Sequence, residues 1–148
     1  METVLVNWGL PALFCVSFLA ATVLPIASEW LLAALVVQPV DITVAVVVAT
    51  AGNTLGAMTT WAIGLWGGPW IMQRWLRISE KDRIRAESWY TRWGSWSLLM
   101  AWAPAVGDPL CLVAGMFNVP LTRFIPLVTA GKAGRYLVVA WAARQLVI

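Results

Sequence analysis

The chain has no histidine among its 148 residues, and charged residues make up only 11% of it. The absence of histidine excludes His-based catalytic triads, His general bases and His metal sites. A soluble domain has about 25% charged residues, whereas 61% of this chain is hydrophobic. Its ten Lys/Arg and seven Asp/Glu cannot cover a globule of this size. The composition therefore predicts a membrane protein.

Other absences narrow the function further. The sequence has no motif of paired aspartates that could hold a metal, so we expect neither an enzyme nor a bound metal or cofactor. The net charge is only +3, with no basic arm and no aromatic RNA-binding motif, so nucleic acid is not an expected partner.

No Lys or Arg precedes Arg74, so the N-terminal part lacks the positive charge that opens a secretory signal peptide. The apolar run from Leu10 continues past any plausible cleavage site, and we expect it to be a permanent membrane segment. The two cysteines, Cys15 and Cys111, both lie inside apolar runs. We predict that they pack against neighbours rather than form a disulfide or bind metal.

Four apolar stretches follow one another, at residues 8–37, 42–66, 94–119 and 124–143. A helix needs about 20 residues to span the hydrocarbon core, and the second and fourth stretches meet that length as single helices. The first and third stretches contain a proline near the middle and an acid four residues later. These pairs are Pro25 with Glu29 and Pro104 with Asp108, and Pro109 follows the second acid.

Proline removes a helix hydrogen-bond donor and clashes with the preceding turn. One solution for stretches one and three is a re-entrant hairpin, in which two half-helices meet at a bent tip inside the membrane. The tips would contain Pro25 in the first hairpin, and Pro104 and Pro109 in the second. Non-helical backbone at that depth must be buried in protein or line a wet cavity. The alternative is an ordinary spanning helix with a proline kink.

The sequence matches itself at an offset of 79 residues. At this offset Pro25 falls on Pro104, Glu29 on Asp108, and the Thr-Ala-Gly of 50–52 on that of 129–131, without a gap. We interpret the match as an internal duplication. If each unit is a hairpin plus one spanning helix, each unit crosses the membrane once and the second is inverted. Inverted repeats place a binding site near the midplane of the membrane.

The polar segment between the two units is rich in basic residues and tryptophan. Excess Lys/Arg marks the cytoplasmic side, and Ser79-x-x-Asp82 is typical of a helix start. Tryptophan prefers the headgroup level, so we predict an interfacial helix that is either a plain anchor or a contact for anionic lipid or a partner. The predicted fold is an all-α integral membrane protein with one membrane domain over residues 1–148. Repeat one covers about 8–66, the loop and interfacial helix 67–93, and repeat two about 94–143.

Four ionisable residues lie inside the apolar stretches: Glu29, Asp108, Lys132 and Arg135. A charge at bilayer depth costs at least about 2.5–3.5 kcal/mol on insertion scales. One explanation is two buried ion pairs that fix the fold. The other is a polar cavity in which Lys132 and Arg135 bind an anionic phosphate while Glu29 and Asp108 exchange protons. Neighbouring positions are predicted to allow close helix packing, namely Gly52, Asn53, Gly56, Gly131 and Gly134.

Several segments resemble the DedA family of VTT-domain membrane proteins, most closely its YqaA-type branch. They are residues 17–29 (SFLAATVLPIASE), 52–56 (GNTLG), 104–115 (PAVGDPLCLVAG) and 131–136 (GKAGRY). The resemblance spans about residues 14–143 and implies two re-entrant hairpins in inverted repeats. It also implies a multi-pass protein of the bacterial inner membrane that returns a lipid carrier such as undecaprenyl phosphate across it, with proton coupling. Eukaryotic relatives are phospholipid scramblases.

The chain departs from the main DedA branch in its first motif and in its cations. That branch has a Pro-x-Pro-Gly-Glu type motif where this chain reads Pro25-Ile-Ala-Ser-Glu29. It also has arginines at the positions that Ala101 and Gly107 occupy here. The phosphate-binding role would therefore pass to Lys132 and Arg135.

Three other functions compete with lipid translocation. A small proton-coupled drug or solute exchanger is about this short, but would have four plain spanning helices. An intramembrane enzyme acting on lipid phosphates is disfavoured by the missing histidine. A non-transporting assembly factor is the third. The expected partners are membrane lipids and an anionic lipid phosphate, and a homodimer is plausible because so short a chain can hardly enclose a cavity alone.

Overall fold

The computed structural model of the chain describes residues 2–22, 27–38, 40–67, 74, 78–103 and 106–146. Within these residues the protein is all-helical. The α-helices are α1 (Glu2–Ala20), α2 (Ala27–Val36), α3 (Ile42–Trp66), α5 (Glu80–Trp93), α6 (Gly107–Met116) and α7 (Leu121–Gln145), and η1 (Gly94–Trp102) is a 3-10 helix. The first and third apolar stretches are each divided into two helices, α1 and α2 in the first and η1 and α6 in the third. The prolines Pro25 and Pro104 lie outside the described residues, and Pro109 is buried in the first turn of α6.

The helix ends follow local capping chemistry. Asp41 caps α3 by accepting a hydrogen bond from the Thr43 backbone N–H, 2.7 Å away. Ser79 caps α5 by accepting from the Asp82 N–H, which confirms the predicted helix start. In the described part of the chain, α3 is the one helix long and apolar enough to cross a membrane. The helix α7 has the same length of 25 residues but carries Arg123, Lys132, Arg135 and Arg144.

The helix bounds recur at the offset found in the sequence. The first and last residues of α7 each lie 79 positions after those of α3 (42 to 121 and 66 to 145). The bounds of α6 lie 80 positions after those of α2 (27 to 107 and 36 to 116). Core positions recur as well: Ala45 and Ala49 of α3 match Phe124 and Val128 of α7, and all four are buried.

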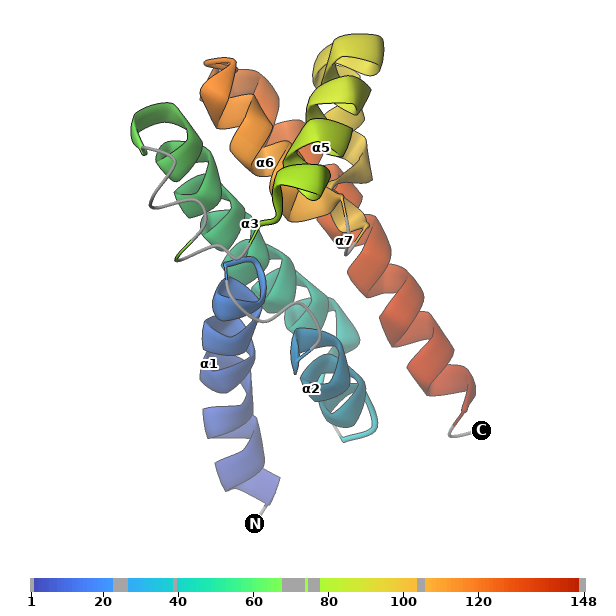
Figure 1. Cartoon of the computed structure of the whole chain (residues 1–148). Helices are drawn as coiled ribbons and strands as arrows, with labels where there is room; N and C mark the ends of the chain where they lie inside the picture. Colours follow the sequence, from blue (N-terminus) through green and yellow to red (C-terminus); the bar gives the residue numbers. More distant parts are fainter. Residues whose placement is uncertain are drawn as a thin grey trace.

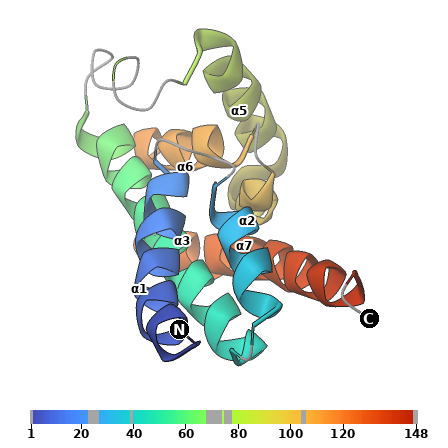
Figure 2. The same cartoon turned by 90° about the horizontal axis from the view of Figure 1, so that it is seen from below.

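The helices of the two units pack against one another in a reciprocal way. The helix α3 packs on α1 of its own unit and on α6 of the other, while α7 packs on η1 of its own unit and on α2 of the other. Figure 1 shows α3 and α7 running in opposite directions, with the α1–α2 pair in the lower half and the η1–α6 pair in the upper half. Seen from below, α1 lies alongside α3 and α2 alongside α7 (Figure 2). Both termini lie at the end opposite α5.

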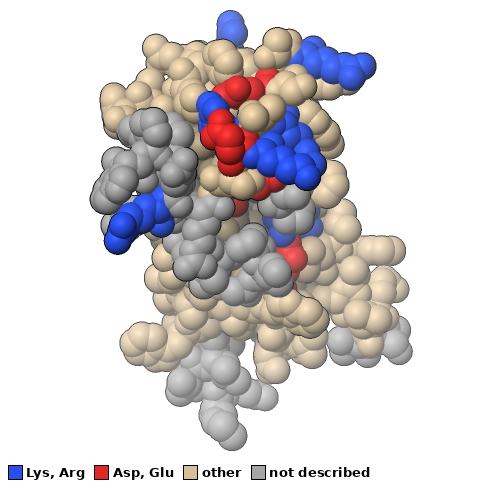
Figure 3. Space-filling model, viewed as in Figure 1, with Lys and Arg blue, Asp and Glu red and all other residues tan. Residues whose placement is uncertain are grey.

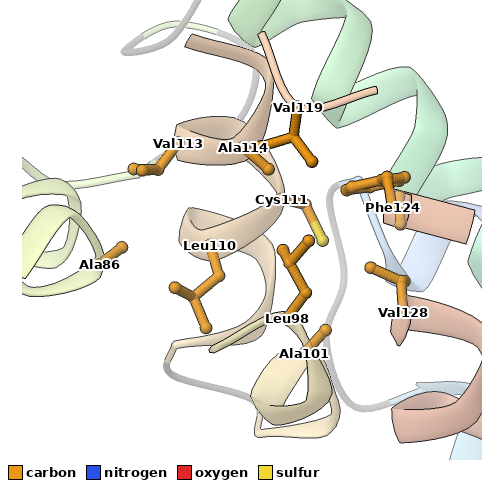
Figure 4. Packing of buried hydrophobic residues seen from close by; sticks show 11 residues of the cluster. Ala86, Leu98, Ala101, Leu110, Cys111, Val113, Ala114, Val119, Phe124 and Val128 are labelled. Atoms are coloured by element: carbon orange, nitrogen blue, oxygen red, sulfur yellow. The ribbon is translucent and has the colours of Figure 1, made fainter. Parts of the chain in front are cut away.

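Two apolar clusters fill the two halves of the molecule. The cluster nearer α5 contains Leu98, Leu110, Cys111, Phe124 and Val128, and Figure 4 shows the Cys111 sulfur among them. The other cluster joins α1, α2 and the start of α3 to the end of α7, with members Leu13, Leu32, Leu35, Ala45, Val46, Ala49 and Ala140. Cys111 is therefore a packing residue, as predicted. Cys15 is exposed on the outer face of α1, so the packing prediction was wrong for it.

Three of the predicted packing glycines lie where two helix backbones touch. A Cβ atom on Gly52 would overlap the Phe14 carbonyl of α1, one on Gly56 the Phe18 carbonyl, and one on Gly131 the Leu99 carbonyl of η1. The same atom on Gly134 would meet nothing within 4 Å. Gly134 shares the outer face of α7 with exposed residues at i+3, i+4 and i+7, so it packs against no other described helix.

This difference gives a matched pair of variants. Gly52→Ala should destabilise the protein by about 1–3 kcal/mol, because the new methyl group forces α1 and α3 apart. Gly134→Ala should be neutral or stabilising by up to about 1 kcal/mol, because alanine favours the helix and nothing obstructs its methyl group. Thermal unfolding of the two purified variants in the same detergent measures the difference. Equal effects would contradict the packing described here.

Candidate functional site

A polar layer separates the two apolar clusters near the middle of the long helices. Along α3, the buried polar residues Thr50, Asn53 and Thr54 lie between core residues Ala49 and Ala57. Along α7, Lys132 lies between Val128 of one cluster and Tyr136 of the other. At a rise of about 1.5 Å per residue, Asn53 and Lys132 lie about 16 Å from the start of their helices. That distance is about half the thickness of the hydrocarbon core.

Lys132 is the buried cation of this layer, with only 3% of its surface exposed. Its ammonium group donates a hydrogen bond to the Asn53 side-chain oxygen and lies 4.0 Å from the nearer carboxylate oxygen of Asp108. Asn53 and Lys132 are themselves equivalent positions at the 79-residue offset. A contact between equivalent positions is what a two-fold relation between two units produces at its axis.

Tyr136 extends the layer toward α2. The Asn53 side-chain amide donates to the Tyr136 hydroxyl at 2.9 Å, and the hydroxyls of Ser28 and Tyr136 lie 3.0 Å apart. Ser28, Asn53, Lys132 and Tyr136 therefore form one buried network that joins both units. Neither Ser28 nor Tyr136 was among the predicted site residues. The available signal was that Tyr136 follows Lys132 by four residues and so shares its helix face.

Arg135 lies about one helical turn from Lys132 and contacts both α2 and η1. Its guanidinium forms an ion pair with Glu29 in the first turn of α2. It also donates to the Trp102 carbonyl, the last residue of η1, at 3.0 Å. That carbonyl lies at a helix end, where it lacks an intrahelical partner. Arg135 thus links the start of the second helix of one unit to the end of the first helix of the other.

The four predicted charges are therefore together in one cluster. Asp108 lies in the first turn of α6 as Glu29 does in α2, and each acid contacts one of two cations three residues apart on α7. The cavity beside them has a volume of about 10 Å³ and is lined by Ala20, Asn53, Ala101, Ala103, Asp108, Lys132 and Arg135. This volume is about that of a single water site, so a phosphate group enters only if the helices move.

The two cations of the cluster, Lys132 and Arg135, have side chains that can bind anions. Ammonium and guanidinium groups form strong charge-assisted hydrogen bonds to phosphate as well as to carboxylate. In the part of the chain that the structure describes, no three Asp, Glu, Cys or His side chains gather as metal ligands would. Close helix packing around the cluster comes from the glycines at 52, 56 and 131, which lie against neighbouring backbones, and Asn53 is buried beside them.

Comparison with known proteins identifies the family. The model of the VTT domain matches residues 24–145, which include every charged residue of the cluster. This chain belongs to the VTT-domain (DedA) family. It is 38% identical over 135 residues to the inner membrane protein YqaA of Escherichia coli, with 90% of each chain covered, and equally similar to YqaA of Shigella flexneri. A protein of Haemophilus influenzae, described as uncharacterized, is 34% identical over 133 residues, covering 84% of this chain and 81% of that one.

No solved structure matches the chain. The family and the named relatives make it a bacterial inner membrane protein. VTT-domain proteins are membrane proteins, and α3 is long and apolar enough to cross a bilayer. Membership in the family is consistent with a membrane transport or related role.

Proposed function

We propose that this protein translocates a phosphate-bearing lipid across the bacterial inner membrane, with Lys132 and Arg135 binding the phosphate. The observation that carries the proposal is the position of these two cations near the middle of a 25-residue helix, each beside a carboxylate from a different hairpin. Charged residues at bilayer depth are costly and usually mark a transport pathway. Membrane lipids and an anionic lipid phosphate are the proposed partners.

The proposed arrangement in the membrane is a pair of inverted repeats, each a re-entrant hairpin followed by a spanning helix. The helices α2 and α6 have ten residues each, or about 15 Å at 1.5 Å per residue, which is half of a membrane. The opposite directions of α3 and α7 support inversion (Figure 1). A small drug exchanger with four plain spanning helices is a poorer fit, because the first and third apolar stretches are each split into two helices.

The proposed cycle exchanges carboxylate for phosphate at the two cations. In the closed arrangement Glu29 and Asp108 satisfy Arg135 and Lys132. An entering phosphate takes over these contacts, and the displaced acids pick up protons to avoid lying ionised and unpaired in a dry environment. When the phosphate leaves on the other side, the acids release their protons and pair again. Proton movement would thus accompany each transport cycle.

The position of Ala101 supports the phosphate-binding role proposed for Lys132 and Arg135. Ala101 lines the same cavity as Arg135, and the main DedA branch has an arginine at the position of Ala101. Lys132 and Arg135 reach the same cavity from α7, so the positive charge is supplied from a different helix.

The test is headgroup flipping of a fluorescent polyprenyl phosphate in proteoliposomes. We expect the wild-type protein to move it faster than protein-free liposomes do, and to move a neutral polyprenol no faster. Arg135→Gln should reduce the rate at least tenfold, because it removes a charge-assisted contact to the phosphate. Arg144→Gln is the matched control, since Arg144 lies in the last turn of α7, outside the cluster. Unchanged flipping in a folded Arg135→Gln variant would reject the proposed role.

A further inference from the structure

A second site lies outside the central cluster, where α5, η1 and the start of α7 meet. Two adjoining hollows of about 580 and 460 Å³ open there. Trp93 and Trp96 line both hollows, while Arg92 lines the larger one and Arg123 the smaller. Each is far larger than the central cavity, which has a volume of about 10 Å³.

The walls of this site suit the boundary between lipid and water. Trp93 is 61% exposed and Trp96 is 68% exposed, although both are large apolar rings. The remaining walls include Leu99 in the larger hollow and Leu127 in the smaller. Tryptophan concentrates at the headgroup level of membranes. The site lies at the end of α7 where the helix begins, which is also the end that carries α5.

The charge at this site is positive and is not neutralised by a described acid. Neither Arg92 nor Arg123 forms an ion pair with any residue that the structure describes. The Arg92 guanidinium lies 5.7 Å from the centre of the Trp93 ring. Of the acids on α5, Glu80 and Glu87 are both paired with Arg83. Figure 3 shows both basic and acidic side chains over α5, in keeping with the pairs that Arg83 makes with Glu80 and Glu87.

We propose that these hollows hold one anionic phospholipid of the surrounding leaflet. Its phosphate lies between Arg92 and Arg123, and its acyl chains lie along the apolar walls formed with Trp93 and Trp96. Two separate arginines flanking exposed tryptophans match a lipid with a charged head and apolar chains. A soluble phosphate would leave the apolar walls exposed to water. This lipid site does not depend on transport, because none of its residues belongs to the central cluster.

The test compares lipid binding by native mass spectrometry of the full chain in detergent. We expect phosphatidylglycerol to bind the wild-type protein at least tenfold more tightly than it binds the double variant Arg92→Gln/Arg123→Gln. The matched control is Lys81→Gln/Arg85→Gln, which also removes two positive charges, but from exposed positions of α5 outside both hollows. Its affinity should stay within twofold of wild type. Trp96→Ala should also weaken binding while leaving the net charge intact.

Two further measurements separate a specific lipid site from a loss of folding and from a site for free phosphate. Arg92→Lys/Arg123→Lys retains the charge and should keep most of the affinity, so a general loss of folding is separated from a loss of charge. Inorganic phosphate at about 10 mM, enough to occupy a site that binds free phosphate with millimolar affinity, should not displace the lipid. Equal losses in the two glutamine double variants would show only a diffuse charge effect and would overturn the site. Displacement by inorganic phosphate, or unchanged binding in Trp96→Ala, would overturn the lipid assignment. Because the readout is binding, a failure here leaves the transport proposal untouched.

Discussion

Replacing Lys132 with Met and Asp108 with Leu in one molecule should leave the protein folded but abolish lipid-phosphate transport. The two side chains lie 4.0 Å apart, and Lys132 is almost completely buried. Replacing a buried ion pair with apolar residues of similar volume is often neutral or stabilising, by about 1–4 kcal/mol. A pair that only fixes the fold could therefore be lost without harm. A carrier needs the charge itself, so the flipping rate should fall at least tenfold.

The single variant Lys132→Met completes this experiment. Lys132→Met alone leaves Asp108 without its cation and Asn53 without a donor, and should destabilise the fold by about 3–5 kcal/mol. The double variant should recover most of that loss, as measured by thermal unfolding in detergent, without recovering flipping in proteoliposomes. If the double variant is stable and transports at the wild-type rate, the pair is structural and the proposed mechanism is wrong.

The long helices were predictable from the sequence because their signal is local. The uncharged run at 42–66 coincides with α3, whose bounds are those of the apolar stretch. The prediction for α7 was too short at 124–143, since the helix begins at Leu121 and ends at Gln145. The extra residues include the polar Thr122, Arg123 and Arg144, which a search for apolar residues leaves out. A helix can continue through such residues because they lie near its ends, at the edge of the apolar region.

The charged residues of the site were also predictable, but their pairing was not. A charge in an apolar run is unusual in itself, so Glu29, Asp108, Lys132 and Arg135 could be selected without a structure. Which acid meets which cation depends on how α2 crosses to α7 and on how α6, packed on α3, brings Asp108 to Lys132 of α7. The same tertiary crossing brings Ser28 to Tyr136 over a separation of 108 residues. Hydrophobic periodicity contains no information about such distant contacts.

The two equivalent contacts between the units differ in tightness. At the α3–α6 contact, a Cβ atom on Gly64 would overlap the Leu112 carbonyl, and one on Gly115 the Trp61 carbonyl. The backbones of α3 and α6 therefore touch. At the α2–α7 contact, the positions equivalent to Gly64 and Gly115 at the 79-residue offset are Ala143 and Val36, which carry side chains where the α3–α6 contact has only hydrogen.

This asymmetry predicts whether α2 or α6 moves when the site opens. Separating α2 from α7 breaks fewer close contacts than separating α6 from α3, and it also releases Glu29 from Arg135. Elements with fewer buried contacts open at lower free energy. We therefore expect the backbone amides of α2 to exchange with deuterium at least tenfold faster than those of α6, in protein held in lipid nanodiscs and followed by mass spectrometry.

A variant at Gly115 tests whether its close contact with α3 causes the slower exchange expected for α6. Gly115→Ala should force α6 away from Trp61 and raise the exchange rate of α6 toward that of α2, whereas Gly134→Ala, in open space, should leave both rates unchanged. Faster exchange in α6 than in α2 of the wild-type protein would contradict the prediction, and would make α6 the moving element. In that case Asp108, rather than Glu29, would separate from its cation first, because Asp108 lies in the first turn of α6.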